Sequence, residues 1–198
     1  MYSKLTQKFL FLGVGISVFL LFIIIYGCQT GSDPAINEKK NYTILTDLLH
    51  LENADTLPFP TLTNFDDLEP LFHQKNDTTY VINFWATWCA PCVHEFPYFE
   101  RLAKEMANEP VQIVMVSIDF GKQIRTQLPK FIKKHDVQLP VISLDAPNPH
   151  IWLEKVDPEW EGSIPITIIY RNDQRRFIPE EMPSYEALKK MVEDIKNE

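Results

Sequence analysis

Apolar positions in the C-terminal two thirds of the chain follow strand and helix periods in turn. Residues 79–85 and 111–118 are apolar runs of strand length, and the second is continuous, as expected for a buried parallel strand. Residues 166–170 and 175–178 alternate around the polar turn 171–174, which predicts a β-hairpin. The remaining segments predict helices at 90–108 and 123–135, a short strand at 139–144, a short helix that ends at 156, and a final helix from 185.

This order of elements predicts an α/β fold. Strands separated by helices pair in parallel and place the helices against the sheet, so we expect a central mixed β-sheet flanked by helices on both faces. Before this core, the prolines of residues 57–62 favour an irregular segment or an edge strand, because proline cannot donate to a ladder. Asn64 and Asp66 are candidate caps of a short helix that runs through Phe72.

The N-terminus has a pattern typical of export or membrane anchoring. Lys4 and Lys8 precede an apolar run at 9–26, which is the arrangement of a signal peptide or an anchoring helix. A buried core helix is the alternative, but the charge asymmetry and the terminal position favour targeting. With the lysines inside, the rest of the chain is translocated, which predicts a domain anchored on the extracytoplasmic side of a bacterial cell membrane.

The apolar run ends at Gly27-Cys28, which is similar to a bacterial lipoprotein cleavage box. Tyr26 is bulkier than that pattern usually has. Two alternatives therefore stay open: lipidation of Cys28, or an uncleaved transmembrane helix with Cys28 at its boundary. The predicted organisation is a signal or membrane anchor at 1–28, a polar tether at 29–54 and a folded domain at 55–198.

Composition narrows the range of partners. With 198 residues, of which 45% are apolar, the chain is long enough for one domain with an ordinary core plus appendages. Its formal net charge of −8 argues against nucleic acid as a partner, because no basic cluster remains to neutralise phosphates.

The strongest chemical signal is the pair Cys89 and Cys92, at the junction between the strand 79–85 and the next helix. A thiol at a helix N-terminus faces unpaired backbone N–H groups and the positive end of the helix dipole, so Cys89 is the predicted nucleophile. Cys92 can close a disulfide ring or resolve a mixed disulfide formed on Cys89. Half of a zinc site has the same spacing, but the chain has no second cysteine pair and no His-rich segment. We therefore expect a redox-active pair without a metal, with a structural disulfide or a chance pair of cysteines as the alternative.

Three polar residues near the pair have both a functional and a structural interpretation. Glu95 follows Cys92 by one helical turn and would either exchange the proton that thiol–disulfide chemistry moves or be a solvated helix residue. His94 would be a surface residue or a third metal ligand beside the thiols. Asn83, inside an apolar strand, would be a hydrogen-bonded buried group or a polar group near the thiols.

Three tryptophans are divided between surface and core. Trp88 is expected on the functional surface beside the cysteines, where it contacts substrate, and Trp85 is expected to pack on the sheet. Trp160 would either line a groove for the partner or cover the core.

These residues carry a resemblance to a known family. Residues 83–92, Asn-Phe-Trp-Ala-Thr-Trp-Cys-Ala-Pro-Cys, are followed by Glu-Phe-Pro at 95–97 and, far downstream, by Ser-Ile-Pro-Ile-Thr at 163–167. Together these strings resemble the membrane-tethered, TlpA/ResA-like branch of the thioredoxin superfamily. The resemblance covers about 55–198 and implies a thioredoxin-like fold.

The resemblance also implies features of the site. It implies that the bond between Ile164 and Pro165 is cis, that this loop lies against the disulfide, and that the backbone of Ile164 is offered to an incoming peptide. Cytosolic thioredoxins have a buried Asp and a buried Lys where this chain has Asn83 and Met115. That acid–base pair is absent here, which leaves the source of proton transfer open.

The function that we expect is an anchored, extracytoplasmic thiol:disulfide oxidoreductase that reduces disulfides in exported proteins. Its cycle would run between the Cys89–Cys92 disulfide and the dithiol, without a further cofactor, and would draw electrons from a membrane electron-donor protein. The family resemblance adds cytochrome c maturation as one destination. A dithiol oxidase or isomerase would use the same residues. A copper-binding module would use Cys89, Cys92 and His94, although copper carriers of this superfamily have a wider CxxxC spacing and a distant His.

Overall fold

The computed structural model describes residue 49 and residues 57–197 of the chain. The predicted anchor, Cys28 and all of the predicted tether except Leu49 lie outside the described residues. Within the described part of the chain, no helix is both long enough and apolar enough to cross a membrane.

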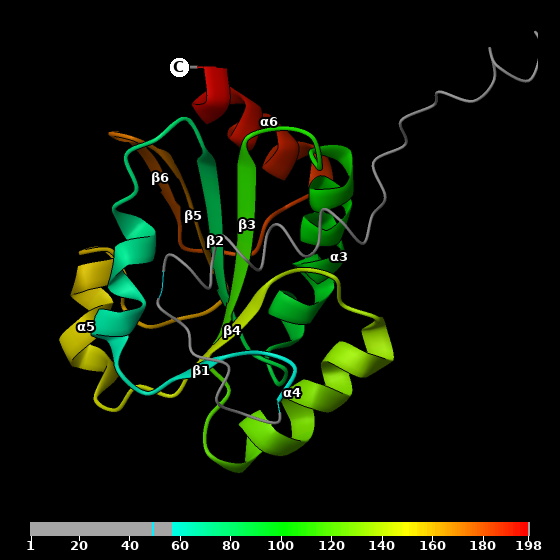
Figure 1. The fold of residues 1–198 in the computed structure, drawn as a ribbon, viewed down its shortest axis with the longest axis vertical. Coiled ribbons are helices and arrows are strands. Elements are labelled where there is room, and N and C mark those ends of the chain that lie inside the picture. Colours follow the sequence, from blue (N-terminus) through cyan, green and yellow to red (C-terminus); the bar gives the residue numbers. More distant parts are fainter. Residues whose placement is uncertain (1–48, 50–56, 198) are drawn as a thin grey trace, which may run out of the picture. The chain divides into compact units, whose positions relative to one another are not determined.

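A six-stranded mixed sheet forms the centre of the fold (Figure 1). The strand order is β1-β4-β3-β2-β5-β6; β1, β4, β3 and β2 are parallel to one another, and β5 is antiparallel to both β2 and β6. The prediction of a central mixed sheet is therefore confirmed. The strands are β1 (Thr61–Leu62), β2 (Thr79–Trp85), β3 (Val111–Ser117), β4 (Val141–Leu144), β5 (Ile166–Arg171) and β6 (Gln174–Ile178).

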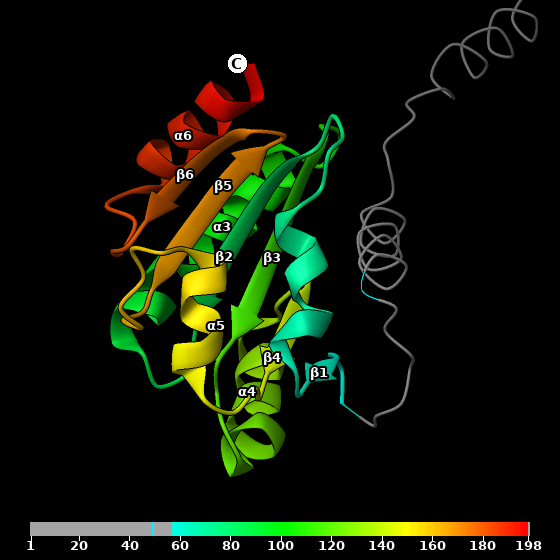
Figure 2. The same cartoon turned by 90° about the vertical axis from the view of Figure 1, so that its left-hand side faces the viewer.

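Helices cover both faces of this sheet, as the sequence predicts. Figure 2 shows the short helix α5 and the 3₁₀ helices of residues 65–72 in front of the sheet, with α3 and α6 behind it. The helices are α3 (Ala90–Glu105), α4 (Lys122–His135), α5 (Pro149–Val156) and α6 (Tyr185–Asn197), with 3₁₀ helices η1 (Phe65–Asp67) and η2 (Glu69–Phe72).

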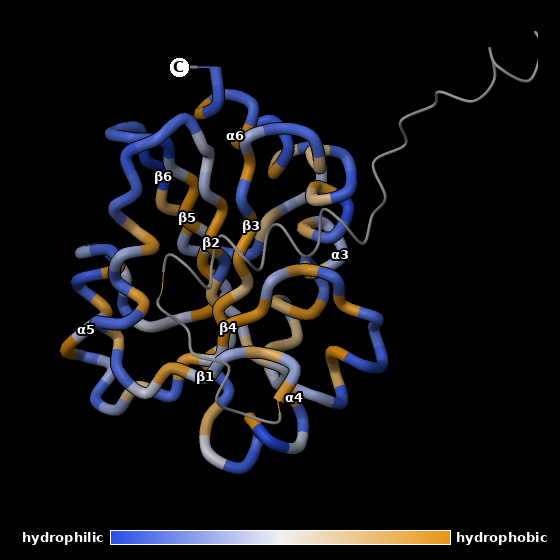
Figure 3. The backbone as a smooth tube through the Cα atoms, in the orientation of Figure 1, coloured by the Kyte–Doolittle hydropathy of each residue, from blue (hydrophilic) through white to orange (hydrophobic). Residues whose placement is uncertain are grey.

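The central strand β2 divides the apolar core into two parts, because its side chains alternate between the faces. Val81 and Trp85 belong to the core beneath α3, α4 and α6, whereas Ile82 and Phe84 belong to the core beneath α5, η1 and η2. Figure 3 shows hydrophobic residues concentrated along these central strands. Since a fully buried side chain of this size contributes about 1.5–3 kcal/mol, β2 is held firmly from both sides, and so is the loop that follows it.

Three predicted elements differ from the structure in type or by more than one residue at a boundary. The helix predicted at 90–108 ends at Glu105, because Pro110 restricts the residue before it and the chain must turn into β3. The strand predicted from residue 139 begins at Val141, since Pro140 has no N–H for the ladder. The helix predicted through Phe72 is two 3₁₀ helices, the first capped by Asn64, whose side chain accepts from the N–H of Asp66 at 3.1 Å. None of these differences moves the site.

Candidate active site

The two cysteines form a disulfide at the junction of β2 and α3, with Cα atoms 5.3 Å apart. Cys89 is the N-cap of α3, and its Sγ accepts the backbone N–H of Cys92 at 3.3 Å. Cys89 is 6% exposed and Cys92 is fully buried. Cys89 is therefore the only cysteine of the pair with any exposed surface.

A second loop lies against this disulfide, although it is distant in the sequence. The peptide bond between Ile164 and Pro165 is cis, which confirms the prediction. The carbonyl oxygen of Ile164 lies 3.8 Å from the Sγ of Cys89. The backbone of Ile164 therefore lies beside the sulfur of Cys89.

The structure separates the three tryptophans. Trp88 is 49% exposed, as expected for a surface residue beside the pair, and Trp85 is fully buried in the core, where its ring lies 4.7 Å from that of Phe96. The idea that Trp160 lines a partner groove is wrong, because this residue is only 4% exposed and its ring packs 4.8 Å from that of Phe84. Its indole Nε1 donates to the carbonyl of Ser163 at 2.7 Å, so Trp160 supports the cis-proline loop from inside.

Glu95 is completely buried on α3, which rules out the solvated interpretation. Its Oε2 accepts the backbone N–H of Met182 at 2.6 Å, and its Oε1 accepts the side-chain N–H of Asn83 at 2.8 Å. Desolvation raises the pKa of Glu95 to about 7, against the lowering effect of these two hydrogen bonds. Because residues three apart are neighbours on a helix face, this carboxyl group and Cys92 share the inner face of α3.

Asn83 connects Glu95 to the neighbouring strand. It lies in β2, pairs in register with Thr167 of β5, and is buried. Its Nδ2 lies 3.0 Å from the Thr167 hydroxyl oxygen and 3.3 Å from the Ile166 carbonyl oxygen. Asn83 is thus both a hydrogen-bonded buried group and a polar group on the active-site side of the sheet.

A second buried carboxylate, not anticipated from the sequence, fixes the loop before Cys89. Asp119 accepts from the backbone N–H of Thr87 at 3.0 Å, from the Thr87 hydroxyl at 2.6 Å and from the Ser117 hydroxyl at 2.8 Å. The available signal was its position just after β3, because parallel strands place their carboxyl ends at one edge of the sheet. Next to Asp119, the side chain of Phe120 is 62% exposed.

His94 is a surface residue that forms an ion pair with Glu181, with Nδ1 and Oε1 2.5 Å apart. Over residue 49 and residues 57–197, the structure has no group of three or more His, Cys, Asp or Glu side chains that could hold a metal ion. The role of His94 as a third metal ligand therefore has no geometric support.

Comparisons with known proteins agree with this geometry. The family model described as Redoxin matches residues 53–150. The thiol-disulfide oxidoreductase ResA of Oceanobacillus iheyensis is 43% identical over 61 residues, which are 31% of this chain and 30% of the relative. The matches to the first curated relatives span only 30–36% of their lengths.

Comparison with solved structures identifies the fold. A thioredoxin-related protein from Neisseria meningitidis serogroup B has a TM-score of 0.52 and 23% identity, over 61% of this chain and 86% of that one. A thioredoxin family protein from Chlorobium tepidum, named as a thiol:disulfide interchange protein, has a TM-score of 0.50 and 20% identity, over 72% of this chain and 99% of that one. At this level of identity they establish a thioredoxin-like fold. Together with the CxxC disulfide and the cis-proline loop, the Redoxin match and the similarity to ResA proteins support a thioredoxin-superfamily protein of the TlpA/ResA-like type.

Proposed function

We propose that this protein is a thiol:disulfide oxidoreductase that reduces disulfides in exported proteins. The observation that carries the proposal is the arrangement at Cys89. This sulfur caps the N-terminus of α3, is the reachable member of the pair, and lies 3.8 Å from the carbonyl oxygen of Ile164. Backbone N–H groups and the helix dipole stabilise a thiolate at this position, and only the thiolate attacks a disulfide.

The cycle begins with the dithiol form. The Cys89 thiolate attacks one sulfur of the client disulfide; that S–S bond breaks, a mixed disulfide forms, and the client's leaving sulfur takes a proton. Cys92 then loses its proton and attacks the Sγ of Cys89, which releases the second client thiol and leaves the Cys89–Cys92 disulfide. Two electrons have passed to the client, and a dithiol electron-donor protein restores them.

Glu95 supplies the base for the second step. Cys92 is buried, so its proton needs an acceptor inside the fold. Glu95 shares the inner face of α3 with Cys92, and its pKa of about 7 lies near the pH at which a general base is most effective. This carboxyl group replaces the buried acid–base pair that cytosolic thioredoxins have and this chain lacks.

The client peptide is held by the two segments that flank the disulfide. The carbonyl of Ile164 offers an acceptor for a backbone N–H of the client, and the half-exposed ring of Trp88 offers an apolar contact. Pro165 keeps the chain in the bend that directs this carbonyl toward Cys89.

The pair works as a reductant. Ala90 and Pro91, between the cysteines, bring no charge and no side-chain donor to the Cys89 thiolate, so only backbone N–H groups and the helix dipole stabilise it. We expect a redox potential below about −200 mV, nearer thioredoxin's value of about −270 mV than the value of about −120 mV of the oxidant DsbA. Equilibration with a dithiothreitol redox buffer measures it, and a value above about −150 mV would indicate an oxidase.

Trapping of mixed disulfides tests the proposal directly. Cys92→Ser should accumulate client adducts through Cys89, because the resolving thiol is gone. Cys89→Ser, its matched control, should trap almost none. Non-reducing gels of both variants provide the readout, and equal trapping would refute the assignment of Cys89 as the attacking thiol.

The location is part of the same proposal. Lys4, Lys8 and the apolar run at 9–26 support a membrane anchor with the domain on the extracytoplasmic side, where exported clients, cytochrome c precursors among them, would be met. Protease added outside the membrane should digest the domain in spheroplasts, whereas protection until lysis would contradict the topology. The mass of the N-terminus in wild type and in Cys28→Ala distinguishes lipidation from an uncleaved helix.

A further inference from the structure

The side-chain amide of Asn83 is satisfied on one side only. Its Nδ2 has two hydrogens for three nearby acceptors, the Oε1 of Glu95 at 2.8 Å, the hydroxyl oxygen of Thr167 at 3.0 Å and the carbonyl of Ile166 at 3.3 Å. Among the residues that the structure describes, its Oδ1 has no hydrogen-bond partner, although Asn83 is buried. A buried acceptor left unpaired is costly, so this orientation needs a compensating gain.

The gain is present only while Glu95 is ionised. In the structure both carboxylate oxygens face N–H donors, Oε1 the side chain of Asn83 and Oε2 the backbone of Met182. A carboxylate accepts both bonds, and the bonds are strong because the acceptor is charged. A protonated carboxyl group carries an O–H that needs an acceptor, yet each oxygen faces a donor.

Only one of these two donors can turn. The N–H of Met182 is fixed in the backbone, whereas the amide of Asn83 can rotate about its last side-chain bond and exchange Nδ2 with Oδ1. After rotation, Oδ1 lies where Nδ2 is now and can accept the new O–H of Glu95, while the longer bond from Nδ2 to the carbonyl of Ile166 is given up. The hydroxyl of Thr167 suits both orientations, because it accepts from Nδ2 in one and donates to Oδ1 in the other.

We propose that Asn83 is a positioning residue whose amide turns over each time Glu95 gains or loses a proton, so that both forms of the carboxyl group stay hydrogen-bonded. The inference rests on the proposed function, in which Glu95 exchanges a proton with Cys92 during each cycle. Asn83 touches neither client nor cysteine in this role; it lowers the cost of the proton movement by supplying a donor to the base and an acceptor to the acid.

Two charged groups besides the cysteines act on Glu95 and must be controlled. Glu181 raises the pKa of Glu95 and His94 lowers it, and these two residues form an ion pair with each other at 2.5 Å. The experiment therefore uses the oxidised chain, whose disulfide does not titrate, and a His94→Gln background, which removes the imidazole. Desolvation raises the pKa of Glu95 to about 7, so the transition falls in an accessible pH range.

NMR on the full chain tests the rotation without touching Asn83. Above the transition, the Nδ2 protons should show a strong nuclear Overhauser effect to the Hβ of Thr167, and below it this effect should be lost. Its midpoint should coincide with that of the Glu95 carboxyl carbon. An effect of equal strength on both sides of the carboxyl transition would overturn the proposal.

Substitution provides the second measurement. Asn83→Leu should raise the midpoint of Glu95 by about one pH unit, because the charge-assisted bond lost by the carboxylate is about twice as strong as the neutral bond lost by the acid. Thr167→Val, the matched control, removes a partner of both orientations and should shift the midpoint by less than half as much. An unchanged or lowered midpoint in Asn83→Leu would contradict the role. Client reduction enters neither measurement, so a failure of the proposed function remains distinguishable.

Discussion

Two of the three glutamates on helix α3, Glu95 and Glu105, have opposite acid–base behaviour. Glu95, in its first half, is buried against β2, and desolvation raises its pKa to about 7. Glu105 is the last residue of the helix, where Tyr185, Lys189 and Arg101 lower its pKa to about 2. The helix dipole would have the reverse effect, because its C-terminal end disfavours a negative charge. Burial and the neighbouring side chains therefore determine the pKa of each glutamate more strongly than its position along the helix does.

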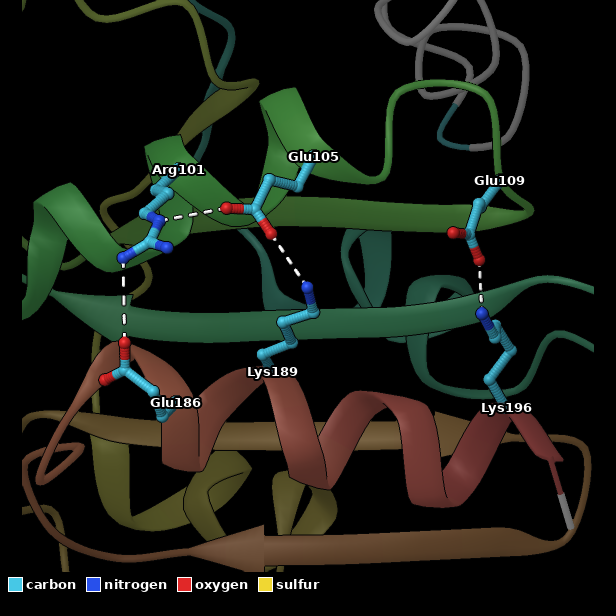
Figure 4. A network of polar contacts seen from close by, with 6 residues as sticks. All are labelled: Arg101, Glu105, Glu109, Glu186, Lys189 and Lys196. Carbon is cyan, nitrogen blue, oxygen red and sulfur yellow. Dashed lines mark hydrogen bonds and ion pairs between the residues drawn. The ribbon is translucent and has the colours of Figure 1, made fainter.

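The surroundings of Glu105 explain the difference. Its Oε2 lies 2.9 Å from the ammonium of Lys189 and its Oε1 lies 3.0 Å from the Nε of Arg101 (Figure 4). Arg101 also lies 3.7 Å above the ring of Tyr185 and reaches Glu186 at 3.7 Å. A further ion pair, between Lys196 and Glu109, links the far end of α6 to the loop after α3. These contacts attach α3 to α6.

The comparison shows how one helix serves two purposes. Toward the sheet it presents a carboxyl group whose hydrogen-bond partners, Asn83 and the backbone of Met182, are neutral, which suits proton exchange near neutral pH. Toward α6 it presents a carboxylate, Glu105, whose pKa is lowered to about 2 and which is therefore ionised at neutral pH, and this suits docking. Exchange of the two environments would destroy both properties.

The largest expected effect is on catalysis. Glu95→Gln removes the base for Cys92, so client reduction at neutral pH should fall about 100-fold, the lower end of what general acid–base catalysis contributes. Glu105→Gln, on the same helix, should leave the rate unchanged. Stopped-flow measurement of the reaction with a model disulfide checks both, and equal losses in the two variants would remove the distinction between the glutamates.

The second effect is on stability as a function of pH. Because burial raises the pKa of Glu95 from 4.5 to about 7, the folded state holds this proton more tightly than the unfolded chain does. The free energy of unfolding should therefore fall as pH rises from 4.5 to 7, by about 3 kcal/mol from this group. Urea titrations at several pH values should show this slope in wild type and a flatter one in Glu95→Gln. An equal slope in both would contradict the assignment.

The third effect concerns Asp119, which is buried like Glu95 but lies at the end of β3. Thr87→Val removes the hydroxyl that donates to it at 2.6 Å, and should lower the free energy of unfolding by about 1–3 kcal/mol. Because Thr87 lies two residues before Cys89, the reaction of Cys89 with disulfides should slow as well. Thr126→Val removes a hydroxyl that donates to an exposed carbonyl on α4, and is the matched control. Comparable losses of stability in the two variants would argue against a special role for Asp119.

Most of the scaffold could be predicted because its signals are local. The bounds of β2 follow from one apolar run, and the start of α3 follows from Pro91 and the cysteine pair. Buried partnerships could not be predicted in the same way. The spacing of Glu95 from Cys92 is compatible both with a solvated residue and with a proton carrier. The burial that decides between them depends on distant partners, such as the N–H of Met182, which comes from a loop 87 residues further along the chain.

The same limit explains Trp160 and Asp119. Trp160 was equally compatible with a groove and a core, because its burial depends on Phe84 and Trp152, which lie on other elements. Asp119 follows a buried strand, but its partner Thr87 follows a different one, and only the parallel register of β2 and β3 places the two together.

The smallest effect is expected at Glu105 itself. Its pKa is lowered from 4.5 to about 2, so the ionised carboxylate stabilises the fold fully at pH values above 4.5. This contribution is lost as the pH falls through about 2. The ion pairs of Glu105 are exposed to solvent, and salt screens the attraction between their charges. At pH 7, Glu105→Gln should therefore lower Tm by no more than about 2 °C. Calorimetry in low salt and in 1 M salt should show that even this difference shrinks as salt rises. A decrease in Tm that persists in high salt would mean that Glu105 stabilises the fold through packing against Tyr185. Glu105 and Glu95 would then differ in their packing as well as in their electrostatic surroundings.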